Sequence, residues 1–154
     1  MTERNRWYIL AALLGAAGLV VHFTLPMAAV GTLLNDIVFL GMVVLVVMAG
    51  MDAKRRGNKA SRLGAVLGVI YGGLLGIGDV IYTPHGPAVV KLFERSYPSL
   101  THREILSRVV LLNTMSARLG ALFSSVTVWL LLGLLFAWIG SLLVKNSGSR
   151  QSQQ

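Results

Sequence analysis

Apolar runs of near-membrane length dominate this sequence. Four of them, at residues 7–25, 33–51, 62–83 and 119–144, are separated by polar or proline-containing segments. A helix needs about 20 apolar residues to cross the roughly 30 Å hydrocarbon core of a bilayer. In lipid, backbone polar groups must be satisfied within the structure itself, so only helices and closed barrels span a membrane. The sequence therefore predicts an all-α, polytopic transmembrane helical bundle with four spans.

The composition excludes the main soluble classes of protein. Hydrophobic residues make up 55% of the 154-residue chain and charged residues 13%, whereas soluble domains carry about 25% charged residues. The formal net charge is +8, but the basic residues flank apolar runs, which favours membrane orientation over nucleic-acid binding. The chain has no cysteine and three widely separated histidines, so we expect no cofactor and no metal site. The expected partners are the lipid bilayer and either a second copy or another membrane protein.

The first apolar run has an alternative interpretation. It follows Arg4 and Arg6 and stops at Pro26, and a positive start followed by an apolar stretch also describes a secretory signal peptide. The run is long for the apolar region of such a peptide, and no clean small-x-small cleavage site follows it. We therefore interpret 7–25 as the first span.

A basic segment connects the second and third runs. It holds five basic residues in nine positions: Lys54, Arg55, Arg56, Lys59 and Arg62. With four spans both termini lie on the same side as this segment, and that side carries nine of the fourteen basic residues, against five on the other. Because short cytoplasmic loops are enriched in Lys and Arg, we expect cytoplasmic amino and carboxyl termini, in a bacterial inner (cytoplasmic) membrane. Binding of anionic lipid headgroups is the alternative role for this segment.

The outer connection between the third and fourth runs, 84–118, contains its own helix signals. Pro87 suits the first position of a short helix over 88–97, and the mixture of apolar and charged residues in that helix predicts that it lies on the membrane surface. Thr101 and Glu104 have the spacing of a capping box, so a further helix is expected to begin at 102.

Nothing obvious stops this further helix before Lys145. A continuous helix of that length would exceed the membrane thickness, so we expect it either to protrude or to bend near Gly120. A single membrane-embedded domain, 1–146, precedes a polar tail, 147–154, that is expected to be disordered.

The third run carries the strongest local pattern. Four glycines stand at strict four-residue spacing: Gly64, Gly68, Gly72 and Gly76. Each glycine costs a helix about 1 kcal/mol relative to alanine, but small residues at this spacing let membrane helices approach closely. This glycine zipper predicts tight helix packing, either within the bundle or against another subunit.

One ionisable residue from each span falls near the outer end of the bundle: His22, Asp36, Asp79 and Arg118. At 100° per residue, Asp79 lies in the middle of the arc of about 120° that the four glycines cover, so it should face protein rather than lipid. We expect Asp79 to pair with Arg118 or His22, with Asp36 and Tyr82 nearby. Such a cluster would serve as a proton- or cation-sensing site, or as a small substrate site open to the outside. The alternative is that these charges simply extend from helix ends into water.

The sequence contains no motif that identifies an enzyme. It has no phosphate-binding loop, zinc helix or nucleophile elbow, and Ser125, inside an apolar run, is expected to bond its own helix backbone or fill a packing site. The leading prediction is a non-enzymatic protein that acts through helix–helix assembly, as an accessory subunit or homo-oligomer. The alternative is a small channel or transporter that uses Asp79. A third is a membrane enzyme that acts on lipid or quinone through His85 and His102.

Overall fold

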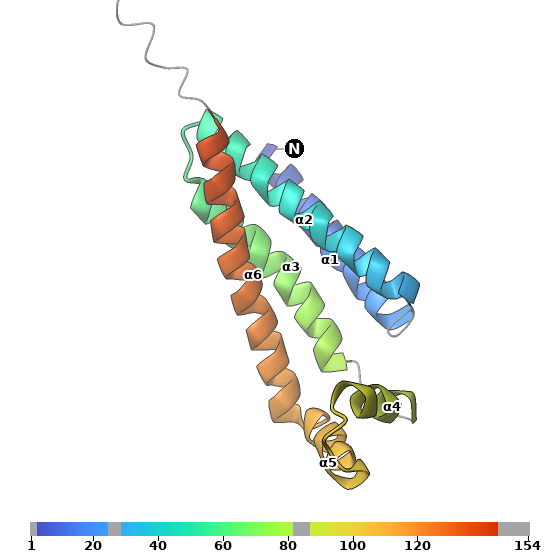
Figure 1. Cartoon of the computed structure of the whole chain (residues 1–154). Coiled ribbons are helices and arrows are strands. Elements are labelled where there is room, and N and C mark those ends of the chain that lie inside the picture. Colours follow the sequence, from blue (N-terminus) through green and yellow to red (C-terminus); the bar gives the residue numbers. More distant parts are fainter. Residues whose placement is uncertain (1–2, 25–28, 82–86, 145–154) are drawn as a thin grey trace, which may run out of the picture.

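Six helices form the regular structure of the described residues, which are 3–24, 29–81 and 87–144 of this computed structural model (Figure 1). In chain order they are α1 (Glu3–Thr24), α2 (Ala29–Arg55), α3 (Ala60–Ile81), α4 (Pro87–Ser96), α5 (His102–Leu112) and α6 (Met115–Leu143). The tail 147–154, predicted to be disordered, lies outside the described residues.

Four of these helices are long and apolar enough to cross a membrane. The candidate spans are Asn5–Phe23, Gly31–Arg55, Ala60–Ile81 and Met115–Leu143. At 1.5 Å per residue, a helix of 22 residues such as α3 measures about 33 Å, enough for the hydrocarbon core. The predicted fold class is confirmed: the chain is a small, all-helical integral membrane protein with four spans in contact with the bilayer.

The spans pack as a bundle in which α1 and α6 are diagonal to each other. The most extensive packing joins α3 to α6, while α1 packs against α2 and α3, and α2 also packs against α6. The first residues of α1, the turn between α2 and α3, and the last residues of α6 lie at one end (Figure 1). We call this the basic end, because five basic residues, predicted to set the topology, are all exposed there: Lys54, Arg55, Arg56, Lys59 and Arg62.

Glycines bring α3 and α6 into backbone contact. A Cβ atom added at Gly64 would clash with the carbonyl oxygen of Gly133, and one added at Gly68 would clash with that of Trp129. Gly72 and Gly76 also lie against α6. All four glycines of the predicted stripe therefore face α6 of the same chain, where the missing side chains allow the close approach that membrane helices use for packing.

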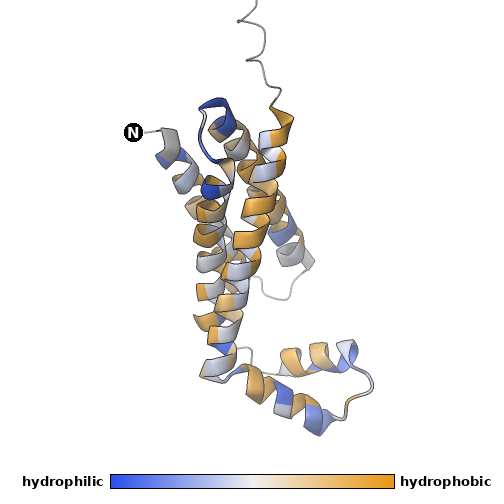
Figure 2. Cartoon of the chain, turned by 90° about the vertical axis from the view of Figure 1, so that its left-hand side faces the viewer, coloured by the Kyte–Doolittle hydropathy of each residue, from blue (hydrophilic) through white to orange (hydrophobic). Residues whose placement is uncertain are grey.

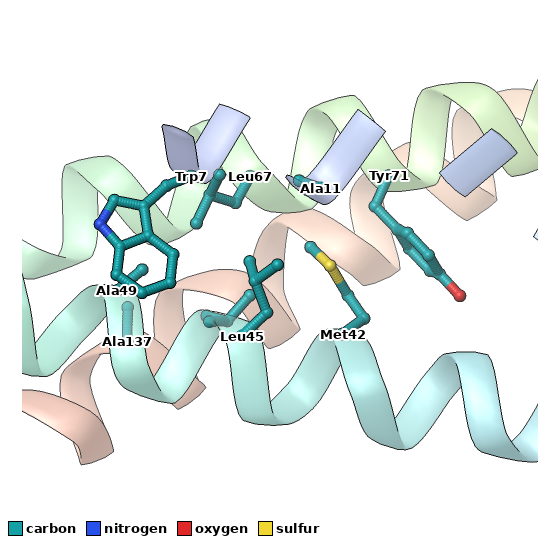
Figure 3. Packing of buried hydrophobic residues seen from close by; sticks show 9 residues of the cluster. Trp7, Ala11, Met42, Leu45, Ala49, Leu67, Tyr71 and Ala137 are labelled. Carbon is teal, nitrogen blue, oxygen red and sulfur yellow. The ribbon is translucent and has the colours of Figure 1, made fainter. Parts of the chain in front are cut away.

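The hydrophobic core fills the half of the bundle nearer the basic end (Figure 3). Its buried members are Trp7, Ala11, Met42, Leu45, Val46, Ala49, Leu67, Tyr71 and Ala137. The Trp7 Nε1–H donates to Asp52 Oδ2 over 3.1 Å, and Arg56 Nε–H donates to Asp52 Oδ1 over 2.9 Å. Asp52 thereby ties the start of α1 to the end of α2 and closes this half of the bundle.

The opposite end carries α4 and α5, and we call it the hairpin end. The two short helices pack on each other around buried Val89, Ile105 and Val109, and they extend sideways from the bundle (Figure 2). The predicted capping box at Thr101 and Glu104 is confirmed. The short helix expected to begin at Pro87 is α4. A second short helix, α5, follows it.

A helix from 102 was expected either to protrude from the membrane or to bend near Gly120; instead it breaks earlier, between Leu112 and Met115, and α6 is continuous from Met115 to Leu143. Asn113 caps the end of α5 and Thr114 caps the start of α6. The Thr114 hydroxyl donates to the Leu111 carbonyl over 2.7 Å and accepts from the Ala117 N–H over 3.3 Å. One hydroxyl thus satisfies a backbone group of each helix, which stabilises the break.

Candidate functional site

A cavity of about 330 Å³ lies between the four spans, in the half of the bundle nearer the hairpin end. Each span contributes to its wall. The lining residues are Gly18 and His22 from α1; Asn35, Asp36 and Phe39 from α2; Tyr71, Leu75 and Asp79 from α3; and Ser125 and Trp129 from α6. The α1–α2 pair separates from the α3–α6 pair toward this end (Figure 1), so the cavity occupies the space that the hydrophobic core leaves unfilled.

A histidine and a carboxylate face each other in this cavity. His22 Nε2 lies 3.9 Å from Asp79 Oδ1, and the two side chains are 32% and 40% exposed. Gly78 helps to create this approach, since a Cβ atom there would come within 2.7 Å of Leu19 and 3.7 Å of the His22 ring. The contact is an ion pair only when the imidazole is protonated, so the arrangement can hold a proton or accept a cation in place of one.

Aromatic rings from three spans form another part of the wall. The Phe39 and Trp129 ring centroids are 5.4 Å apart with the rings tilted, and Tyr71 meets Trp129 edge to face at 4.3 Å. Ser125 Oγ donates to the Gly72 carbonyl oxygen over 3.0 Å, which ties α6 to α3 beside these rings. Tyr71 also belongs to the hydrophobic core, so the aromatic wall stands where the core ends and the cavity begins.

The structure brings part of the predicted polar cluster together. His22, Asp36 and Asp79 all line the cavity, whereas Arg118 is not among the lining residues. Arg118 Nη1 donates to the Val80 carbonyl oxygen over 3.2 Å, and Nη2 donates to Asn113 Oδ1 over 3.3 Å. Arg118 therefore binds the last turn of α3 and the break between α5 and α6. Tyr82 lies outside the described residues.

The predicted cluster did not include seven of the ten lining residues: Gly18, Asn35, Phe39, Tyr71, Leu75, Ser125 and Trp129. Two spacings carried a usable signal, because Phe39 follows Asp36 by three residues and Trp129 follows Ser125 by four, which places each pair on one helix face. Ser125 was expected to bond its own helix backbone or to fill a small packing site; its Oγ donates to the α3 backbone rather than to its own helix.

Of the two histidines in the outer connection, the structure describes only His102, which is not among the residues that line the cavity. His102 is exposed and its Nδ1 atom lies 2.7 Å from Glu94 Oε1, so it joins α5 to α4. His85 lies outside the described residues. Within the described part of the chain, no group of three or more His, Cys, Asp or Glu side chains is placed to hold a metal ion.

In comparisons with known proteins, no family model, curated protein or solved structure matches this chain. The function therefore has to be inferred from the chemistry of the cavity.

Proposed function

We propose that this protein is a small, non-enzymatic transporter that admits a cation to the cavity and binds it at Asp79. The supporting observation is the placement of two carboxylates, Asp36 and Asp79, on a cavity of about 330 Å³ lined by all four membrane spans. A carboxylate at membrane depth is costly unless it pairs or lines a solvated route, and such groups commonly mark ion and proton pathways. The neighbouring His22, 3.9 Å from Asp79, offers a second group that can exchange a proton as the cation enters.

The two halves of the bundle differ in a way that favours a transporter over an open channel. The half nearer the basic end is filled by side chains such as Met42, Val46 and Leu67, which are at most 2% exposed. A solute in the cavity would therefore meet packed side chains in that direction. Access from one side at a time is what a transporter requires, and a channel would need a continuous route.

We place the cavity on the outer side of a bacterial cytoplasmic membrane. The exposed Lys and Arg residues at the basic end, where the α2–α3 turn is hydrophilic (Figure 2), support this placement, because positively charged connections remain in the cytoplasm. The cavity lies toward the opposite end, so the solute enters from outside.

The test is transport by the full chain reconstituted in proteoliposomes. Currents are recorded on a solid-supported membrane after addition of sodium, tetramethylammonium or protons. We expect a current with at least one of these cations and loss of most of it in Asp79→Asn, because the amide keeps the shape of the side chain but cannot compensate a positive charge.

The matched control is Asp52→Asn, which removes a carboxylate from the same bundle but outside the cavity, where Asp52 bonds Trp7 and Arg56. This variant should keep the current. If Asp79→Asn folds normally and transports as well as the unmodified protein, the cavity is not the route and the proposal is wrong.

Assembly with a second copy or with another membrane protein is the second candidate function. The glycine stripe that suggested it is occupied by α6 within the chain. A different face favours it: Ser116, Gly120 and Ser124 stand one turn apart on α6, all exposed, and no atom would lie within 4 Å of a Cβ at Gly120. Small residues at this spacing suit close contact with another membrane helix. Native mass spectrometry of the gently extracted protein would reveal a stable complex if assembly is the function.

A further inference from the structure

The charge of the cavity is opposite to the charge of the chain. The formal net charge of the protein is +8, yet the charged side chains in the cavity wall are Asp36 and Asp79, and the third titratable group near them is His22. Arg118, which was expected in the same cluster, is not among the lining residues, and its guanidinium donates to the Val80 carbonyl and to Asn113 Oδ1. The cavity is therefore a site of negative charge within a low-dielectric bundle, where a bound cation would offset the cost of burying carboxylates.

Apart from polar Asn35 and Ser125, the remaining wall is apolar and aromatic. Phe39 and Trp129, 5.4 Å apart between ring centroids, come from neighbouring spans, and Leu75 and Gly18 add hydrocarbon surface. An inorganic cation requires a dense shell of oxygen ligands, whereas half of the lining residues carry no side-chain oxygen: Gly18, His22, Phe39, Leu75 and Trp129. Aromatic faces attract alkylated ammonium groups, whose charge is spread over methyl or methylene groups that also pack against apolar side chains.

The cavity also has the size of a small-molecule site. Its volume of about 330 Å³ falls at the lower end of the range of roughly 300–1,000 Å³ found for ligand pockets. We infer that the solute is a small organic cation, a quaternary or protonated amine whose charge lies at Asp79 and whose apolar part lies against Phe39 and Trp129. This inference rests on the proposed function, because it specifies the solute for the same cavity.

The probe is benzyltrimethylammonium, which combines a fixed positive charge with one aromatic ring. Its binding to the full chain in lipid nanodiscs is measured by isothermal titration calorimetry, with sodium as the inorganic comparison. We expect saturable binding of the organic cation, which sodium does not displace at equal concentration. Trp129→Leu should weaken the affinity about tenfold, the size of a desolvated cation–π contact, and Asp79→Asn should abolish binding.

Trp138→Leu is the matched control, since Trp138 lies on the same helix, is 55% exposed and is not part of the cavity wall. This variant should bind as the unmodified protein does. Phe39→Leu provides a second aromatic variant if Trp129→Leu fails to fold, because Phe39 is 39% exposed and outside the core.

The outcomes distinguish the transporter proposal from the inference that the solute is an organic cation. If sodium or protons give a current that depends on Asp79 while benzyltrimethylammonium does not bind, the organic-cation inference is wrong and the transporter proposal stands. If benzyltrimethylammonium binds but both aromatic variants bind it equally well, the aromatic wall does not select the solute and the inference is also wrong. If no cation binds and no current depends on Asp79, both proposals fail.

Discussion

At the scale of single residues, the absence of a side chain determines how α3 meets α6. A Cβ atom at Gly68 would clash with the backbone of Trp129, whereas one at Gly73, on the same helix, would have no neighbour within 4 Å. We expect Gly68→Ala to destabilise the bundle by about 1–3 kcal/mol, because a backbone atom cannot move aside as a flexible side chain can. Gly73→Ala should be neutral or stabilising by up to about 1 kcal/mol through helix propensity.

Thermal unfolding of both glycine variants in the same detergent measures this difference. The paired design separates packing from helix propensity, since the chemical change is identical at the two positions. Equal melting temperatures for Gly68→Ala and Gly73→Ala would show that α3 and α6 are not in backbone contact in the membrane.

The direction of a side chain around its helix could be predicted at this scale, but its partner could not. Helical spacing placed Asp79 on the same arc as the glycines, and the structure has Asp79 on the cavity between the spans. Whether Asp79 lies beside His22 or beside Arg118 depends on how α1 and α6 are rotated about their own axes. That rotation is fixed by packing between helices, such as the contact of Gly78 with Leu19, which one sequence does not reveal.

At the scale of elements, α5 begins with a capping box whose strength depends on an ionised carboxylate. The Thr101 N–H and hydroxyl both donate to Glu104 Oε2 over 2.7 Å, and the Glu104 N–H donates to the Thr101 hydroxyl over 3.4 Å. The hydrogen bonds from the side chain and backbone of Thr101 hold the pKa of Glu104 below its usual value of 4.5. The stabilisation of α5 is therefore fully present above this value and is lost as the pH falls through the lowered pKa.

The order of the α5 amides can be followed by nuclear magnetic resonance during a titration from neutral pH to about pH 3, below the usual pKa of Glu. The unmodified protein should lose order in the first turn of α5 at the acid end. Thr101→Ala should lower the local stability of this helix by about 1 kcal/mol even at neutral pH. Glu104→Gln keeps an acceptor without a charge, so its first turn should be independent of pH. A titration that Glu104→Gln leaves unchanged would assign the effect to another group.

The starts of helices were easier to predict than the break between α5 and α6. Pro87 and the capping box at Thr101 are local signals that act over a single turn, and both mark helix starts in the structure. The cap at Thr114 lacks the acidic residue three positions later that completes such a box, because Ala117 stands there. Apolar residues also continue on both sides of it, so the pattern resembled one long helix.

At the scale of the whole molecule, the bundle divides into a packed half and a half with a cavity. Apolar run lengths predicted the number of spans, and the positions of His22, Asp36 and Asp79 within those runs predicted that ionisable groups share one level. Neither the volume of the cavity between these groups nor its aromatic wall could be predicted. Both arise from the separation of α1 and α2 from α3 and α6, which depends on contacts between residues far apart in the sequence.

The orientation of this divided bundle decides which side supplies the solute. The chain has no cysteine, so single cysteines report on orientation without further substitution. Asn58→Cys marks the exposed turn at the basic end and Ser107→Cys marks the exposed surface of α5. With a maleimide that does not cross membranes, we expect intact bacterial cells to be labelled at 107, and at 58 only after permeabilisation.

The opposite labelling pattern would place the hairpin end and the cavity toward the cytoplasm. The cavity would then bind a cation from the cytoplasm, and the proposed transport would begin on that side. Labelling at both positions in intact cells would contradict a fixed orientation, and the excess of basic residues around the α2–α3 turn would then have to serve contact with anionic headgroups. The expected pattern instead fits the proposed transporter, with the cavity on the outer side and the packed basic half on the cytoplasmic side.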